Sequence, residues 1–271
     1  MLNETKRWSY SLLGARLAGF GLGSRLKAAA IHLGISGMVA SLAAGLVFGL
    51  WYPWPYSQAS GGLSLVLLII GVDLVLGPTL TFVIYNRTKT RTHLVRDLGV
   101  IAVLQLAGLS YGLHSVFLAR PVAVVFEVDR FRVVTHNEVL HAELPQALPE
   151  MRRLSLTGPR ILAARTAQNG EEKFKAIELA LQGYDTGTRP TFWRPYSEFS
   201  TSVLQRARPL TDLYLHYPDH AEELDREIAK LKRNPGDLKF LPLMAREANW
   251  SVLIDKNTAE IVGFVPYDGF F

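Results

Sequence analysis

An aspartate lies in the middle of a long apolar stretch of this chain. Residues 63–85 read LSLVLLIIGVDLVLGPTLTFVIY, and Asp73 is the only formally charged residue among them. A carboxyl group in hydrocarbon costs about 2.5 to 3.5 kcal/mol on insertion scales, so it should face other helices, where it is protonated or hydrogen-bonded. Gly77 permits close approach of a second backbone, and Pro78 leaves one helical carbonyl without its N–H partner. We therefore predict a helix whose centre requires polar partners.

A partner for Asp73 is available in the last of three apolar stretches. Residues 98–119 carry Gln105, Gly108 and Gly112 on one face of the expected helix. The Gln105 amide can donate a hydrogen bond to the Asp73 carboxyl group, and the two glycines allow a neighbouring helix to approach closely. The residues predicted to form a bundle core, or to bind a partner helix, are Asp73, Gly77, Pro78, Gln105, Gly108 and Gly112.

The first apolar stretch, residues 28–50, has small residues at every fourth position. They are Gly37, Ser41, Gly45 and Gly49. Such a stripe favours packing of one helix face against a neighbour, although glycine is also frequent in membrane helices generally. His32 and His114 also lie in apolar stretches, where they can pair with polar groups of neighbouring helices. Nothing in the pattern supports a proton relay through them.

Catalytic and metal-binding patterns are otherwise missing from the sequence. An intramembrane aspartyl protease requires two carboxyl groups that share a proton, yet Asp73 is the only acidic residue in the three apolar stretches. His216 and His220 are separated by Pro218, which disfavours a common helical face, and no third ligand is evident. No phosphate-binding loop, dinucleotide fingerprint, Gly-x-Ser-x-Gly motif or cysteine occurs. We predict no catalytic residue, no metal site and no cofactor.

The three apolar stretches, residues 28–50, 63–85 and 98–119, are long enough to cross a membrane. At about 1.5 Å per residue, each covers the roughly 30 Å hydrocarbon core of a bilayer. They account for the apolar character of a 271-residue chain with 49% hydrophobic residues and a mean hydropathy of +0.15. We predict a three-helix transmembrane region over residues 28–119, which follows an N-terminal segment, residues 1–27.

Basic residues beside these stretches predict how the chain is oriented. Residues 1–119 hold nine lysines and arginines against three acidic residues, whereas residues 120–271 have a net charge of −1. Five of the nine precede residue 28, four follow the second stretch, and the loop between the first two stretches has none. By the positive-inside rule, the N-terminus and the loop after the second stretch are cytoplasmic. Three spans then place residues 120–271 on the far side of the membrane, which in a Gram-negative cell is the periplasm, so that they form a periplasmic domain. The small charge of this domain argues against nucleic acid as a partner.

Aromatic residues and prolines dominate the loop after the first stretch. It begins WYPWPY and contains Trp51, Tyr52, Trp54 and Tyr56. Exposed aromatic side chains held by prolines lose little entropy on binding, which favours a recognition surface on the periplasmic face. Tryptophan and tyrosine are also typical of the interface between a bilayer and water, so the same residues fit an aromatic belt. The two interpretations can coexist.

From residue 120 the hydrophobic pattern changes to the period of two that indicates β-strands. Asp219 and Glu222 have the spacing of a capping box at the start of a helix, which an Asn-Pro-Gly sequence ends. The predicted strands are 122–128, 131–135, 154–156, 160–164, 238–246, 250–255 and 260–265, and the predicted helices are 171–183, 197–207 and 219–233. We predict a single α+β domain with a mainly antiparallel sheet.

Four segments, taken in order, resemble one known protein family. They are WYPWPY, GVDLVLGPTLTFVIY, DLGVIAVLQLAGLSYG and ARPVAVVFEVDRFRVV. This series resembles the TfpX/TfpZ-type type IV pilin accessory proteins over the three apolar stretches and the first strands, and more loosely beyond. The resemblance implies a non-enzymatic inner-membrane protein that binds a cognate type IV pilin, the major pilin, and assists or modulates its assembly into pili. Other pilus-assembly components are further expected partners.

The alternative function is a membrane-anchored enzyme that modifies an envelope substrate through its periplasmic domain. A domain cleft lined by convergent ionisable groups with strongly shifted pKa values would favour the enzyme. An apolar groove or an open sheet edge in place of such a cleft would favour the accessory function. The two functions therefore predict different features in the structure of this domain.

Overall fold

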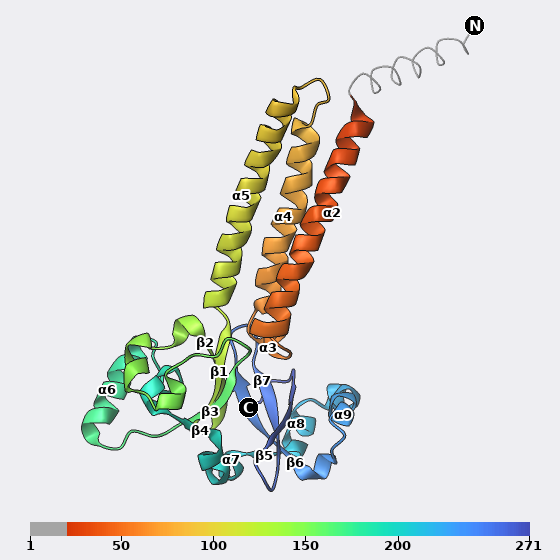
Figure 1. The fold of residues 1–271 in the computed structure, drawn as a ribbon. Coiled ribbons are helices and arrows are strands. Elements are labelled where there is room, and N and C mark those ends of the chain that lie inside the picture. Colours follow the sequence, from red (N-terminus) through yellow and green to blue (C-terminus); the bar gives the residue numbers. More distant parts are fainter. Residues whose placement is uncertain (1–20) are drawn as a thin grey trace. The chain divides into compact units, whose positions relative to one another are not determined.

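The computed structural model describes residues 21–271 of the chain (Figure 1). Most of the predicted N-terminal segment, with Lys6, Arg7 and Arg16, lies outside the described residues. The rest of the chain forms two compact units. The first contains the described residues up to Leu46 together with Ser64–Ser115, and the second contains Val47–Leu63 together with Val116–Phe271.

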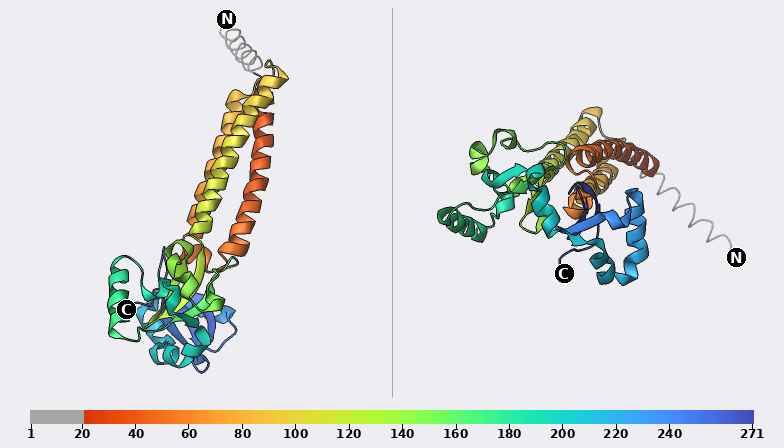
Figure 2. Two further views of the ribbon diagram at one scale, coloured as in Figure 1. Left: turned by 60° about the vertical axis from the view of Figure 1, so that its left-hand side comes forward. Right: turned by 90° about the horizontal axis from the view of Figure 1, so that it is seen from below.

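Three long helices form the first unit and run side by side (Figures 1 and 2). They are α2 (Leu22–Leu46), which continues into a π-helical turn (Val47–Trp51), α4 (Gly62–Ile84) and α5 (Arg91–Leu118). Each is long and apolar enough to cross a membrane. The three predicted apolar helices are confirmed as helices, and α4 runs through Pro78 without interruption.

The packed face of α2 differs from the predicted one. The predicted stripe consists of Gly37, Ser41, Gly45 and Gly49. A Cβ atom added at any of these glycines would meet no atom within 4 Å, and the serine is exposed, so the predicted packing of this stripe is wrong. The buried residues of α2 are instead Ser36, Ala40 and Ala43. They continue the helix face of His32, whose hydrogen bonds to the other two helices turn that face inward.

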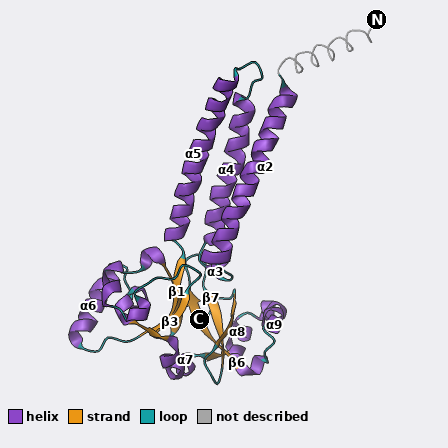
Figure 3. Cartoon of the chain, in the orientation of Figure 1, coloured by secondary structure: helices purple, strands orange, loops and turns teal. Residues whose placement is uncertain are grey.

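The second unit contains a mixed sheet whose strand pairs are mostly antiparallel (Figure 3). Its strands are β1 (Pro121–Glu127), β2 (Arg130–Thr135), β3 (Arg160–Ala164), β4 (Trp193–Pro195), β5 (Arg208–Pro209), β6 (Leu238–Met244), β7 (Trp250–Asp255) and β8 (Ile261–Val265). They lie in the order β4-β3-β1-β2-β6-β7-β8, and β5 pairs with β6 beside this path. Only β1 with β3 and β2 with β6 are parallel pairs in this sheet. The predicted α+β arrangement is therefore confirmed.

Both faces of the sheet are covered, which explains why every residue of β1 is buried. Val124 faces a hydrophobic cluster that includes Val203, whereas its neighbour Val125 faces a cluster on the opposite side that includes Met151. The α-helices that follow β3 in this unit are α6 (Gly170–Leu181), α7 (Ser200–Arg206), α8 (Leu210–His216) and α9 (Ala221–Lys230). A third cluster joins α8 and α9 to β6 and β7.

Local predictions differ from the structure at several places in this unit, including the short strands β4 and β5, which were not predicted. Residues 154–156 form no strand in the structure. The N-cap of α9 is His220, which makes no side-chain capping bond, so the predicted capping box of Asp219 and Glu222 does not form. Helix α8 was not predicted, because its seven residues are too short for a clear helical repeat.

Residues 47–63 belong to the second compact unit. They include a short helix, α3 (Tyr56–Ala59), that packs into one of the sheet's clusters. Tyr52 is fully buried and its hydroxyl donates to the carbonyl oxygen of Val116 at 3.3 Å. The ring of Tyr56 lies edge-on to Phe264 of β8, with centroids 5.7 Å apart.

The burial of Tyr52 and Tyr56 corrects the expectation of exposed aromatic side chains in this loop. Both rings fill space inside the second unit, so they are unavailable for recognition or for a membrane belt. Trp51 is partly buried and packs edge-on against Phe117. Trp54 alone of the four is strongly exposed, with 58% of its surface accessible.

Candidate functional site

Three residues on one face of α4 organise the centre of the first unit. Asp73, Gly77 and Thr81 are spaced four residues apart, which places them along a single line on the helix. A Cβ atom at Gly77 would overlap the side-chain amide of Gln105 on α5. The glycine therefore makes room for Gln105 between the aspartate and the threonine.

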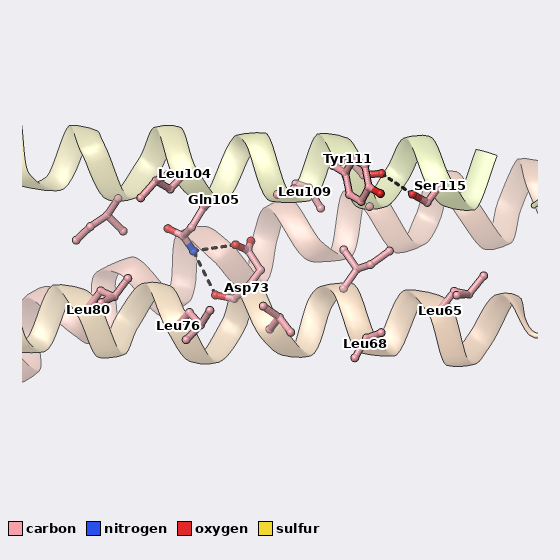
Figure 4. Close-up of a pocket in the computed structure, with 15 residues that line it drawn as sticks. Leu65, Leu68, Asp73, Leu76, Leu80, Leu104, Gln105, Leu109, Tyr111 and Ser115 are labelled. Atoms are coloured by element: carbon pink, nitrogen blue, oxygen red, sulfur yellow. Dashed lines mark hydrogen bonds between the residues drawn. The ribbon is translucent and has the colours of Figure 1, made fainter. Parts of the chain in front are cut away.

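Gln105 and Asp73 form the predicted hydrogen bond. The Nε2 group of Gln105 donates to Oδ1 of Asp73 at 2.9 Å and to the Asp73 carbonyl oxygen at 3.2 Å (Figure 4). These two bonds tie the middle of α4 to the middle of α5. The polar centre that the sequence indicated for these helices is thus formed within one chain.

His32 of α2 extends this pair into a network that joins all three helices. Its Nδ1 atom lies 2.6 Å from Oγ1 of Thr81, and its Nε2 atom lies 2.7 Å from Oε1 of Gln105. An amide oxygen only accepts, so Nε2 carries the proton and, in a neutral ring, Nδ1 accepts from the threonine hydroxyl. Thr81, His32 and Gln105 then donate in one direction, and the series ends at the Asp73 carboxyl group, which accepts.

The other predicted core residues have different environments. A Cβ atom at Gly112 would lie 2.8 Å from Cγ2 of Ile69, so this glycine allows α4 and α5 to approach, as predicted. A Cβ atom at Gly108 would meet no atom within 4 Å. Gly108 instead lines an open space on the surface of these helices. His114 is exposed and lies outside the polar network.

That open space is a groove between α4 and α5 with a volume of about 550 Å³ (Figure 4). Its walls are mostly aliphatic side chains, and it extends from Leu65 and Ser115 at one end to Leu80 and Ile101 at the other. Asp73 and Gln105 lie within it. Among the described residues, no group hydrogen-bonds to Oδ2 of Asp73, so the groove offers a free acceptor in an apolar setting.

The second unit has a smaller charged cleft, of about 410 Å³, that includes Glu127, Arg132 and Asp185. Burial raises the pKa of the Glu127 carboxyl group, and nearby Arg132 partly opposes this effect. However, Oε2 of Glu127 accepts the backbone N–H of Gly187 at 2.8 Å, and Arg132 forms an ion pair with Asp185. These groups hold a turn of the chain in place, and no described cluster of three His, Asp or Glu side chains could bind a metal ion.

Comparison with known proteins identifies the family. A model of the fimbrial assembly protein FimB family matches residues 20–61, which contain His32 and the aromatic loop. The fimbrial assembly protein of serogroup I from Dichelobacter nodosus is 39% identical over 246 residues, which cover 90% of this chain and 95% of that protein. This chain belongs to the fimbrial assembly protein family.

Further family members match different shares of the chain. The fimbrial assembly protein of serogroup E1 from Dichelobacter nodosus is 38% identical over 246 residues, with 90% of this chain and 95% of that protein covered. The protein of serogroups C1 and C2 is 44% identical over 121 residues, which are 45% of this chain and 92% of that protein. No solved structure matches the chain.

Sequence reasoning missed Thr81 in the polar network of this family member. The available signal was its position two intervals of four residues after Asp73, which places both side chains on one face of the helix. Threonine is common in apolar helices, where its hydroxyl can hydrogen-bond to the backbone of its own helix. Its residue type alone therefore did not indicate that Thr81 belongs to the network.

Proposed function

We propose that this chain is a bacterial inner-membrane protein of the TfpX/TfpZ type, which binds a type IV pilin and assists its assembly into pili. Its relatives from Dichelobacter nodosus are named fimbrial assembly proteins, which supports the process. The strongly exposed aliphatic side chains of the three helices, such as Leu42 and Val103, support insertion into a bilayer. A pilin as the partner follows from the resemblance of the four sequence segments.

The proposed orientation rests on the distribution of basic residues. The turn between α4 and α5 contains Arg87 and Lys89, α5 begins with Arg91, and the loop between α2 and α4 contains no basic residue. The positive-inside rule then places the α4–α5 turn in the cytoplasm and the second unit in the periplasm. A reporter fused after Phe271 should be active in the periplasm and one fused near Lys89 in the cytoplasm. Cytoplasmic activity at Phe271 would contradict the three-span arrangement.

The groove between α4 and α5 is the structural observation that best supports pilin binding. Before assembly, a pilin lies in the same membrane through an apolar helix, and a groove with aliphatic walls can accept such a helix without exposing polar groups to lipid. The free oxygen of Asp73 can accept one hydrogen bond from the bound helix. We propose that this bond sets the register of the pilin helix in the groove.

We also propose that the protein is not an enzyme. The ionisable groups of the charged cleft are engaged with one another and with the backbone, which supports a structural role for them. The terminal strand β8 pairs on one side only within the described sheet, and such an edge can bind another chain. These features fit the accessory function better than the enzyme alternative.

Site-specific photo-crosslinking in cells tests pilin binding. A photoreactive residue placed at Leu68 or Leu104 lies in the groove, and both side chains are more than half exposed. The matched control is Leu42 on α2, which is also strongly exposed but does not line the groove. The co-expressed cognate pilin should crosslink to the groove positions and not to the control.

Two outcomes would count against the proposal. Equal crosslinking from all three positions would indicate random encounters in the membrane, and no crosslinking to pilin from Leu68 or Leu104 would exclude the groove as its site. An unrelated pilin provides the specificity control. Catalytic turnover of an envelope component by the purified full-length protein would instead favour the enzyme alternative.

A further inference from the structure

A second groove lies at the end of the first unit where α2 begins and α4 ends. All three long helices line it, and its volume is about 540 Å³. Its walls include Ile31 and Ile35 of α2 and Leu98 and Ala102 of α5. From Ser24 to Ile35, the α2 wall extends for about 17 Å at the rise of an α-helix. The groove is therefore long, and apolar side chains of α2 and α5 line part of it.

Two basic side chains lie at the end of this groove. Lys27 follows the first turn of α2, and Arg87 follows the end of α4. The ion pairs in the described part of this unit join Asp97 to Lys89 and Arg96, so neither Lys27 nor Arg87 has an acidic partner there. Two cations that have no acidic partner among the described residues, at the mouth of such a groove, are complementary to an anionic headgroup that carries a hydrocarbon chain.

The inner part of the groove fits the hydrocarbon chain of such a molecule. His32 and Thr81 are its polar lining residues at that depth, and they are hydrogen-bonded to each other. The second nitrogen of His32 is bonded to Gln105. A chain that enters the groove therefore leaves no polar group of this pair without a partner.

We propose that this groove binds an anionic phospholipid. The phosphate contacts Lys27 and Arg87, the Tyr85 hydroxyl is available as a further donor, and one acyl chain lies along Ile31 and Ile35. This inference rests on the proposed membrane insertion but not on pilin binding. The bound lipid would fill the space between α2, α4 and α5 next to the polar network, and so would stabilise the bundle in membranes rich in anionic lipid.

Lipid selectivity of the full-length protein tests this site. The protein is reconstituted into phosphatidylcholine vesicles that contain spin-labelled phosphatidylglycerol or spin-labelled phosphatidylcholine, and electron spin resonance measures the relative association constant. The wild type should prefer phosphatidylglycerol, and Lys27→Gln with Arg87→Gln should each reduce this preference about fivefold. Arg91→Gln is the matched control, because Arg91 carries the same charge at the start of α5, four residues after Arg87, but does not line the groove.

A second variant separates the groove from surface charge. Ala102→Phe keeps both cations but fills the apolar wall, and it should abolish the preference while circular dichroism shows an unchanged helix content. Added inorganic phosphate should not displace the spin-labelled lipid. Equal loss in Arg91→Gln, no effect of Ala102→Phe, displacement by inorganic phosphate or no preference in the wild type would each overturn the proposal. A protein that cannot be reconstituted would contradict membrane insertion instead.

Discussion

Replacement of Gln105 by leucine is the most direct test of the polar network. The side chain of Gln105 takes part in three hydrogen bonds, two with Asp73 and one with His32. Hydrogen bonds between membrane helices contribute about 0.6 kcal/mol on average, so loss of three should lower the free energy of unfolding by about 2 kcal/mol. Thr81→Val removes a single bond and should lower it by about 0.6 kcal/mol.

Unfolding of the full-length protein in mixed micelles, followed by circular dichroism as the fraction of denaturing detergent increases, measures both changes. Val103→Leu is the control, because Val103 is on the same helix but is 66% exposed and outside the network. The expected order is Gln105→Leu, then Thr81→Val, then the control, which should be within about 0.5 kcal/mol of wild type. If Gln105→Leu and Val103→Leu were equally stable, the network would not hold the bundle together and our reasoning would be refuted.

Three further predictions concern the aspartate, the aromatic loop and the partly buried His136. Asp73→Asn should retain pilus assembly and Asp73→Leu should lose it at normal protein abundance; equal loss in both, measured as surface pilin, would indicate that the carboxyl group itself transfers a proton. Tyr56→Ala should destabilise the second unit by about 3 to 5 kcal/mol in a thermal melt, whereas Trp54→Ala should change it by less than about 0.5 kcal/mol; similar effects would contradict the burial difference. Burial and the neighbouring Arg120 charge lower the pKa of His136 from 6.5 to about 4. The unfolded state therefore binds more protons between these values, and wild type should lose stability relative to His136→Gln as the pH falls through this window, by at most about 1.4 kcal/mol per pH unit. Parallel stability curves for the two proteins would show that His136 titrates normally.

The element types were largely predictable because their signals are local. Continuous apolar runs of more than twenty residues indicate long helices, and alternation at period two indicates strands, whatever the rest of the chain does. The hairpin of β7 and β8 was predictable for the same reason, since its turn lies between two adjacent hydrophobic runs. The Asp73–Gln105 bond was predictable because few polar groups are available at the centres of these helices.

The sequence by itself therefore determined three apolar helices, an α+β domain and one polar contact between helices. The tertiary structure decided which face of α2 packs, because small residues occur on more than one face and only the contacts of His32 select between them. It also decided that Tyr52 and Tyr56 are buried, since an aromatic loop has the same sequence whether it faces lipid, water or a sheet. The parallel pairing of β2 with β6 likewise joins strands about one hundred residues apart, and no local pattern encodes a partner at that distance.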